Sequence, residues 1–195
     1  MGTRNLTIVY LDGEYKVAQY GQWDGYPEGN GLKVLHFLKD MDEEKFRAAV
    51  RKTSFADPKK LDTLWKKYGA VGGVISVEDA RKFGEAYPQF YRDTGPEILQ
   101  IIMKHPEGIE LQDDLTFAAD GLYCEWAWVI DLDKRTFEGY KGFGSEPLTE
   151  QDRFYFLRDL EENGYSGVRL VAEWSIDELP SDEDFLAAFK EDDEE

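Results

Sequence analysis

The fold is decided by residues 6–20, which read Leu-Thr-Ile-Val-Tyr-Leu-Asp-Gly-Glu-Tyr-Lys-Val-Ala-Gln-Tyr. The runs 6–11 and 15–20 are rich in β-branched and aromatic residues, which favour strands. Asp12-Gly13 between them is a strong signal for a two-residue type I′ turn, because both turn positions need a positive φ. We therefore expect an antiparallel hairpin at the start of the chain.

Helical patterns follow this hairpin. Helices are expected at 32–38, 43–52, 58–68, 76–87 and 94–105. Asp57-Pro58 and Ser76 are predicted N-terminal caps, and Thr94 with Glu97 reads as a capping box.

The second half returns to strands. Residues 122–131 alternate, which would place Leu122, Cys124, Trp126, Trp128 and Ile130 on one face. Residues 135–140 complete a second hairpin, and 168–176 form a fifth strand. Further helices are expected after Thr149 and Ser181. This order predicts a single α+β domain over residues 1–190, with an antiparallel or mixed sheet of about five strands and helices packed against it. An acidic, disordered tail is expected at 191–195.

Composition narrows the class of protein. The chain has 195 residues, of which 42% are apolar and 14% aromatic, so it has enough apolar surface for a packed core. No apolar run approaches the roughly 20 residues of a membrane span, and no signal peptide is apparent. Cys124 is the only cysteine, so an internal disulfide is excluded and a cytoplasmic location is expected.

The net charge of −18 is unevenly distributed. Residues 1–80 hold 12 basic and 12 acidic residues, whereas 81–195 hold 11 and 29. This balance argues against generic nucleic-acid binding, which needs cations to replace counterions on phosphates. The single basic stretch, Lys45 to Lys67, is interpreted mostly as a solvated helix face.

The most unusual passage is residues 21–31, Gly-Gln-Trp-Asp-Gly-Tyr-Pro-Glu-Gly-Asn-Gly. Polar and aromatic side chains among four glycines suit a small polar ligand, which the backbone could approach closely. The candidate ligand-binding residues are Thr3, Arg4, Gln22, Trp23, Asp24, Tyr26, Glu28, Gly29 and Gly31. The alternative is structural: Gln22 and Asp24 would hydrogen-bond the turn, while Trp23, Tyr26 and Pro27 fill the core.

Thr3-Arg4-Asn5-Leu6-Thr7, together with residues 20–31, resembles a family of small uncharacterised proteins of bacteria, viruses and some fungi. Its members begin Met-x-Thr-Arg and carry Gln-aromatic-Asp-Gly-Tyr-Pro-x-Gly-x-Gly after the first hairpin. The resemblance covers roughly the first 38 residues, with weaker similarity from Tyr123 to Asp131. It implies that Arg4, Gln22 and Asp24 form one constellation, and it implies no particular reaction.

The hairpin also joins these residues physically, because antiparallel pairing brings Thr3–Asn5 beside Gln22–Asp24. Arg4 would then either pair with Asp24, locking the loop, or line a pocket with it and face a phosphate or carboxylate.

Other chemical groups are sparse. Cys124 is expected to be a buried apolar residue, and His36 and His105 have no metal-ligand spacing, so no metal site is predicted. Asp131 and Asp133 are expected to shape a hairpin turn. Glu125 is a possible additional acid: it would have a raised pKa if its strand face is covered, and be an ordinary surface acid if not. A hydrolase using Asp24 and Glu125 is conceivable, but nothing in the sequence places the two together.

The sequence therefore predicts two alternative functions, and neither specifies a reaction or a cofactor. The first is binding of a small polar ligand, such as a nucleotide derivative, at the N-terminal hairpin and its loop. The alternative is an acidic interaction or inhibitor protein, in which residues 81–195 imitate nucleic acid or dock a basic partner.

Overall fold

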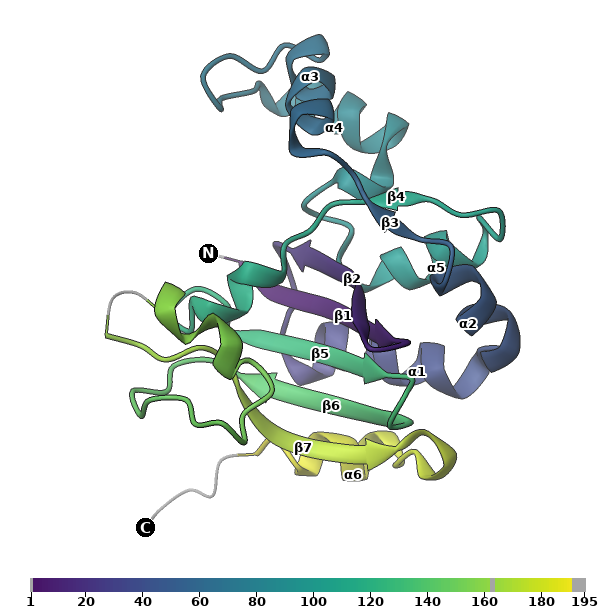
Figure 1. The fold of residues 1–195 in the computed structure, drawn as a ribbon, viewed down its shortest axis with the longest axis vertical. Helices are drawn as coiled ribbons and strands as arrows, with labels where there is room; N and C mark the ends of the chain where they lie inside the picture. The colour runs from purple at the N-terminus through teal and green to yellow at the C-terminus, as the bar shows by residue number, and fades with distance from the viewer. Residues whose placement is uncertain (1, 162–163, 191–195) are drawn as a thin grey trace.

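The structure, a computed structural model, describes residues 2–161 and 164–190. A five-stranded mixed sheet with the order β2-β1-β5-β6-β7 lies at its centre (Figure 1). The strands are β1 (Asn5–Leu11), β2 (Glu14–Gly21), β5 (Trp126–Asp131), β6 (Thr136–Lys141) and β7 (Arg169–Ser175). β1 and β5 run parallel, and the other neighbours run antiparallel. The α+β prediction with a mixed sheet is confirmed, and the tail predicted at 191–195 lies outside the described residues.

The first hairpin forms as predicted. Asp12 and Gly13 adopt φ angles of 55° and 79°, the left-handed pair that a type I′ turn needs. The carboxylate of Asp133 accepts hydrogen bonds from both of their N–H groups, at 2.9 and 2.8 Å. Asp131 Oδ1 in turn accepts from the N–H groups of Asp133 and Lys134. The two aspartates therefore shape the second hairpin turn, as expected, and Asp133 joins it to the first.

Strand β5 begins later than predicted, at Trp126 instead of Leu122. The N–H groups of Tyr123 and Cys124 bond the carbonyl of Asp120, which curls residues 120–124 into a turn. The prediction that Leu122 and Cys124 share a strand face with Trp126, Trp128 and Ile130 is therefore wrong. Cys124 packs instead with the cluster on the opposite face of the sheet.

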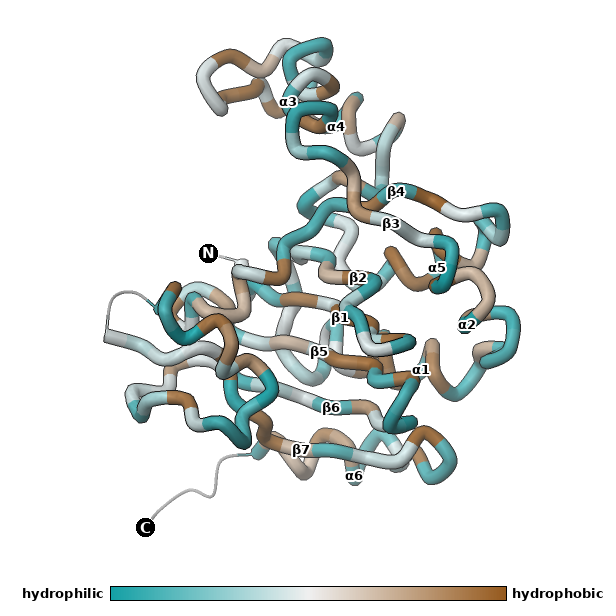
Figure 2. Tube along the Cα trace, viewed as in Figure 1, coloured by the Kyte–Doolittle hydropathy of each residue, from teal (hydrophilic) through white to brown (hydrophobic). Residues whose placement is uncertain are grey.

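Both faces of the sheet are covered. One face contributes Val9, Trp128 and Ile130 to a core under α1 (Leu32–Asp40), α2 (Glu43–Val50), α5 (Ile98–Met103) and α6 (Asp182–Ala187). The other face contributes Leu6, Ile8, Ala127 and Val129 to a second core. This core lies under Leu115–Ala119 and Tyr155–Leu160. In Figure 2, apolar colouring marks the middle of the sheet. Alternate strand residues thus enter different cores.

A helical lobe projects from this body (Figure 1). It consists of α3 (Pro58–Lys67) and α4 (Val77–Ala86), and the parallel pair β3 (Ser54–Phe55) and β4 (Glu110–Leu111) lies at its base. Asp57 and Ser76 cap the two helices through their side chains, as predicted. Trp65 stacks on Phe83 at 3.6 Å in a small core of its own.

Two predicted helices are shorter and tighter than expected. Thr94 Oγ1 donates to Pro88 O and makes no capping box with Glu97, so a 3₁₀ turn (Gly95–Glu97) precedes α5. Thr149 and Asp152 do bond each other, but the described chain continues as turns and a 3₁₀ helix. The 3₁₀ turns are Pro88–Phe90, Gly95–Glu97, Leu115–Ala119, Tyr155–Leu160 and Ile176–Glu178.

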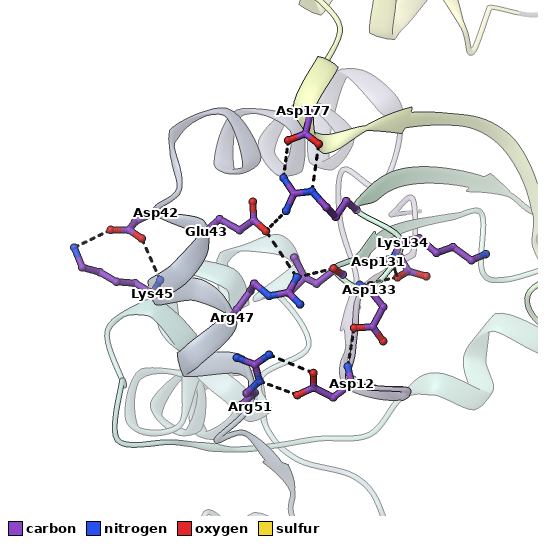
Figure 3. A network of polar contacts seen from close by, with 12 residues as sticks. Asp12, Asp42, Glu43, Lys45, Arg47, Arg51, Asp131, Asp133, Lys134 and Asp177 are labelled. Atoms are coloured by element: carbon purple, nitrogen blue, oxygen red, sulfur yellow. Dashed lines mark hydrogen bonds and ion pairs between the residues drawn. The ribbon is translucent and has the colours of Figure 1, made fainter.

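Arg47 of α2 and Arg51 just after it bind the hairpin turns of the protein itself (Figure 3). Arg51 pairs with Asp12 at 2.8 Å, and Arg47 donates to the carbonyl of Leu132 at 2.6 Å. Glu43 on the same helix pairs with Arg135. Part of the basic stretch, Lys45 to Lys67, therefore attaches α2 to the hairpin turns at one end of the sheet. No helix among the described residues is both long and apolar enough to cross a membrane.

A buried ion network attaches the segment after Thr149 to the sheet. Arg153 Nη2 lies 2.5 Å from Asp131 Oδ2 and 2.7 Å from Glu138 Oε1, and both carboxylates are about 99% buried. Tyr140 donates its hydroxyl to Glu138 at 2.6 Å. Burial and the neighbouring Glu138 raise the pKa of Tyr140, which keeps this donor protonated. One guanidinium thus neutralises part of two buried charges.

We expect Arg153→Met to lower the free energy of unfolding by about 3–5 kcal/mol, because two buried carboxylates lose their cation. Arg51→Met, which breaks a half-exposed pair, should lower it far less, because water screens the two charges. Urea unfolding followed by tryptophan fluorescence measures both. Equal losses in the two variants would contradict the assigned role of Arg153.

Candidate functional site

Buried side chains hold the backbone of the loop at residues 21–31. Asn5 Nδ2 donates to the carbonyls of Gly21 and Trp23, at 3.1 and 3.4 Å. Asn30 Nδ2 donates to the same Trp23 carbonyl at 2.8 Å, and the Trp128 indole donates to Gly25 O at 3.0 Å. The loop conformation therefore depends on donors from β1, from β5 and from the loop itself.

The loop glycines permit close packing within the protein. A Cβ on Gly25 would lie 2.7 Å from Thr3 O, and one on Gly31 would lie 2.8 Å from the Trp128 ring. A Cβ on Gly29 would lie 2.3 Å from Asp24 O. Contacts this short exclude any side chain. For Gly29 and Gly31 the geometry thus favours the structural alternative over close approach to a ligand.

Four loop side chains after Gln22 are exposed, those of Trp23, Asp24, Tyr26 and Glu28. Trp23 is 49% exposed and donates from Nε1 to Asp93 Oδ1 at 3.0 Å. The Tyr26 hydroxyl donates to Asp24 Oδ1 at 3.3 Å, and the charge of Asp24 raises the Tyr26 pKa. Trp23 and Tyr26 therefore do not fill the core, in contrast to the buried Pro27.

Arg4 does not pair with Asp24 in the part of the chain that the structure describes. Its guanidinium lies over the ring of Tyr123, 4.4 Å from the ring centroid. Its backbone N–H donates to Glu125 Oε1 at 3.2 Å, and its carbonyl accepts from Glu125 N–H at 3.1 Å. Arg4 Nε is buried and has no hydrogen-bond partner. Within residues 2–161 and 164–190 no acidic side chain forms an ion pair with it.

Tyr20 and Gln22 complete this group. The hairpin register pairs Leu6 with Tyr20 and Asn5 with Gly21, which puts Arg4 opposite Gln22 at the next position. The Tyr20 hydroxyl donates to Gln22 Oε1 at 2.8 Å. Burial raises the pKa of Tyr20, and the charges of Arg4 and Arg92 oppose that rise.

We call Arg4, Tyr20, Gln22, Tyr123 and Glu125 the Arg4 cluster. It keeps two of the predicted site residues together and adds the predicted additional acid, Glu125, which is partly buried. Thr3 contributes its carbonyl to Gly25 N–H at 2.9 Å. Nothing in the described structure connects Glu125 with Asp24, so the geometry gives the two-carboxylate hydrolase no support.

Tyr20 and Tyr123 are not among the site residues predicted from the sequence. Each stands two residues before a predicted site residue, Gln22 or Glu125. Period-2 alternation could have identified Tyr20, because strand residues two apart share a face. Tyr123 lies in a turn, where no such periodicity applies.

The histidines and the cysteine have other partners. His36 Nε2 contacts Asp182 Oδ2 at 2.7 Å, and His105 Nδ1 contacts the carbonyl of Ile101 at 2.8 Å. Among the described residues, no group of three or more His, Cys, Asp or Glu side chains is arranged to hold a metal ion. Cys124 is fully buried, as expected, and burial raises its pKa well above the ordinary value.

We expect the Cys124 thiol of the native protein to react with a disulfide reagent at pH 8 at least ~100-fold more slowly than after unfolding. Burial both blocks access and disfavours the reactive thiolate. The absorbance of the released thiol measures both rates. Rapid modification of the native protein would contradict the buried position.

We expect Asn5→Asp to lower the free energy of unfolding by about 2–3 kcal/mol at pH 7, because a buried carboxylate would face two carbonyl oxygens. The raised pKa of such a carboxyl means that the variant binds more protons when folded. Its deficit should therefore shrink as the pH falls through that pKa. Urea unfolding at pH 7 and pH 5 tests this, with Gln100→Glu on exposed helix surface as the control. A loss equal to the control's would show that Asn5 does not hold the loop.

The fold and the Arg4 cluster can also be compared with known proteins. No protein-family model, curated protein or solved structure matches this chain. The arrangement of its own residues is therefore the basis for assigning a function.

Proposed function

We propose that the protein binds a small polar ligand at the Arg4 cluster, and that an anionic group of the ligand is held by the Arg4 guanidinium. The observation that carries the proposal is the buried Nε of Arg4, which has no hydrogen-bond partner within residues 2–161 and 164–190. A buried donor left unpaired costs about 1–3 kcal/mol, so an acceptor supplied by a ligand would be stabilising.

The contrast with other arginines supports this function. Arg153 uses its guanidinium on two carboxylates, and Arg47 donates to a backbone carbonyl. Among the described residues the Arg4 guanidinium contacts the face of Tyr123 and pairs with no carboxylate, although the chain contains 41 acidic residues. A carboxylate or phosphate can accept two parallel hydrogen bonds from a guanidinium whose plane is fixed by an aromatic ring.

Gln22 and Tyr123 add selectivity for a polar or ring-bearing ligand. Gln22 Oε1 is occupied by Tyr20, while its Nε2 makes no hydrogen bond within the described residues. Tyr123 is 43% exposed, so part of its ring is free for stacking. The proposal thus retains Arg4 and Gln22 as ligand contacts and gives Thr3, Gly29 and Gly31 to the framework of the loop. It concerns binding and names no reaction.

We expect wild-type protein to bind AMP or ribose 5-phosphate in isothermal titration calorimetry at low salt. Arg4→Met should weaken this binding at least 10-fold, or about 1.4 kcal/mol, because the anion contact is lost. Arg81→Met removes the same charge from an exposed residue of α4, away from the Arg4 cluster, and should change affinity less than 2-fold.

The matched neutral probes, adenosine and ribose, should bind at least 10-fold more weakly than their phosphates. Native mass spectrometry of freshly purified protein provides a second readout, since a retained ligand adds a discrete mass. A wild-type protein that binds neither phosphate and carries no added mass would contradict the proposal. Equal losses in Arg4→Met and Arg81→Met would assign the binding to general charge.

A further inference from the structure

A cavity of about 620 Å³ lies apart from Arg4 and has an acidic lining. It lies against the edge of β2 and is bounded by residues 113–120 and 159–161. Its lining contains five carboxylates and no lysine or arginine: Asp113, Asp114, Asp120, Asp159 and Glu161. Tyr20, Phe117 and Leu160 supply aromatic and apolar wall. We call this the acidic cavity.

Its carboxylates are held in place without being neutralised. Four accept from backbone N–H groups: Asp113 from Leu115 (3.0 Å), Asp114 from Tyr20 (3.1 Å), Asp120 from Tyr123 (3.2 Å) and Glu161 from Gly167 (3.0 Å). Within the described residues, the one ion pair that reaches them is Arg158 with Asp159, at 4.0 Å. Each carboxylate keeps acceptor capacity. Five like charges in one concavity repel one another and attract cations.

Gln19 provides an independent observation beside this cavity. Its Nε2 donates to the carbonyls of Tyr20 and Tyr91, at 3.1 and 3.3 Å, which fixes the orientation of the amide. Its Oε1 is buried without a hydrogen-bond partner, and the residue is only 2% exposed. Gln19 lines a narrower cavity of about 130 Å³, which shares Tyr20 and Asp114 with the acidic cavity. A ligand in the narrower cavity that carries an N–H group would therefore find an unpaired buried acceptor in Gln19.

The narrower cavity has a more aromatic lining, and Asp114 is the one carboxylate among its lining residues. Trp65, Phe90 and Tyr91 supply aromatic wall beside the amide of Gln19. Arg92 also lines it, but its side chain is 59% exposed and lies 3.5 Å from Asp93. Burial raises the pKa of Asp114 between the two cavities, which a bound cation would oppose.

The spacing of these acceptors favours an extended organic cation over a metal ion. A metal needs several ligands converging at about 2–2.6 Å, and no group of three acidic, His or Cys side chains among the described residues converges in this way. A linear polyamine instead carries ammonium groups separated by methylene chains. The ammonium groups suit dispersed carboxylates and the Gln19 acceptor, while the methylenes suit Phe117, Tyr20 and the half-exposed Leu160.

We propose that the acidic cavity and the adjoining narrower cavity bind a linear polyamine such as spermidine. The proposal concerns charged groups other than Arg4, which lines neither cavity, although Tyr20 of the Arg4 cluster lines both. It gives the carboxylate-rich half of the chain a small cationic ligand.

The test is calorimetric titration of the full chain with spermidine at pH 7 in low salt. We expect one saturable site per chain. Asp120→Asn combined with Asp159→Asn should weaken binding at least 10-fold. Asn keeps the acceptor for Tyr123 N–H, and the Asp159 side chain is 86% exposed, so the fold should be retained. The matched control, Glu44→Gln with Glu107→Gln, removes two exposed carboxylates outside both cavities and should change affinity less than 2-fold.

Gln19→Met tests the buried acceptor and should weaken spermidine binding several-fold, with circular dichroism to confirm folding. Arg4→Met should leave spermidine binding intact, which separates this proposal from that for the Arg4 cluster. Absence of a saturable site would overturn the proposal, as would equal losses in the cavity and control variants. Equal competition by Mg²⁺ would assign the binding to diffuse charge. Tighter binding of a tetralysine peptide than of spermidine would replace the polyamine by a basic peptide.

Discussion

The structure depends on the parallel pairing of β1 with β5, which joins residues about 120 positions apart. Parallel neighbours cannot be joined by a tight turn, so the chain between them must cross over the sheet. Here that crossover contains α1 to α5, of which α3 and α4 form the projecting lobe. Because β1 and β5 occupy the interior of the sheet, their alternate side chains are buried on both faces.

The same pairing creates the Arg4 cluster. The contacts between Arg4 and Glu125 extend the β1–β5 pairing beyond Asn5 and Trp126. They bring Tyr123 under the guanidinium, while the antiparallel partner β2 brings Tyr20 and Gln22 from the other side. A group that spans more than 100 residues of sequence is thus assembled by backbone hydrogen bonds. Side-chain contacts of Glu125 and Tyr20 add to these, while the buried Arg4 Nε has no hydrogen-bond partner among the described residues.

Charge is used in three ways in this acidic chain. In the core, Arg153 neutralises carboxylates that would otherwise be costly to bury. At one end of the sheet, Arg47 and Arg51 attach α2 to the hairpin turns. In the acidic cavity the carboxylates have backbone donors and almost no cationic partner. The distribution of paired and unpaired charge, more than the total of −18, marks the two proposed sites.

Features governed by neighbouring residues could be predicted from the sequence. The turn at Asp12-Gly13 needs positive φ, and the caps Asp57, Ser76 and Ser181 need a side-chain acceptor beside free N–H groups. The apolar stripe of α2 likewise follows from helical spacing. Such constraints act over a few residues, so local pattern suffices to place hairpin, helices and the α+β class.

Beyond the two hairpins, tertiary structure alone decided which strands pair and which charges meet. Alternation placed Cys124 with Trp126, but the N–H groups of Tyr123 and Cys124 donate to the Asp120 carbonyl, which turns the chain and places Cys124 in the other core. Arg4 and Asp24 looked like partners from the hairpin register, yet Arg4 lies on Tyr123, which reaches it only through β5. Arg153 meets Asp131 and Glu138 across a distance that no sequence spacing encodes. The physical reason is that pairing and burial depend on contacts made over the whole chain, whereas turns and caps depend on the backbone within one turn.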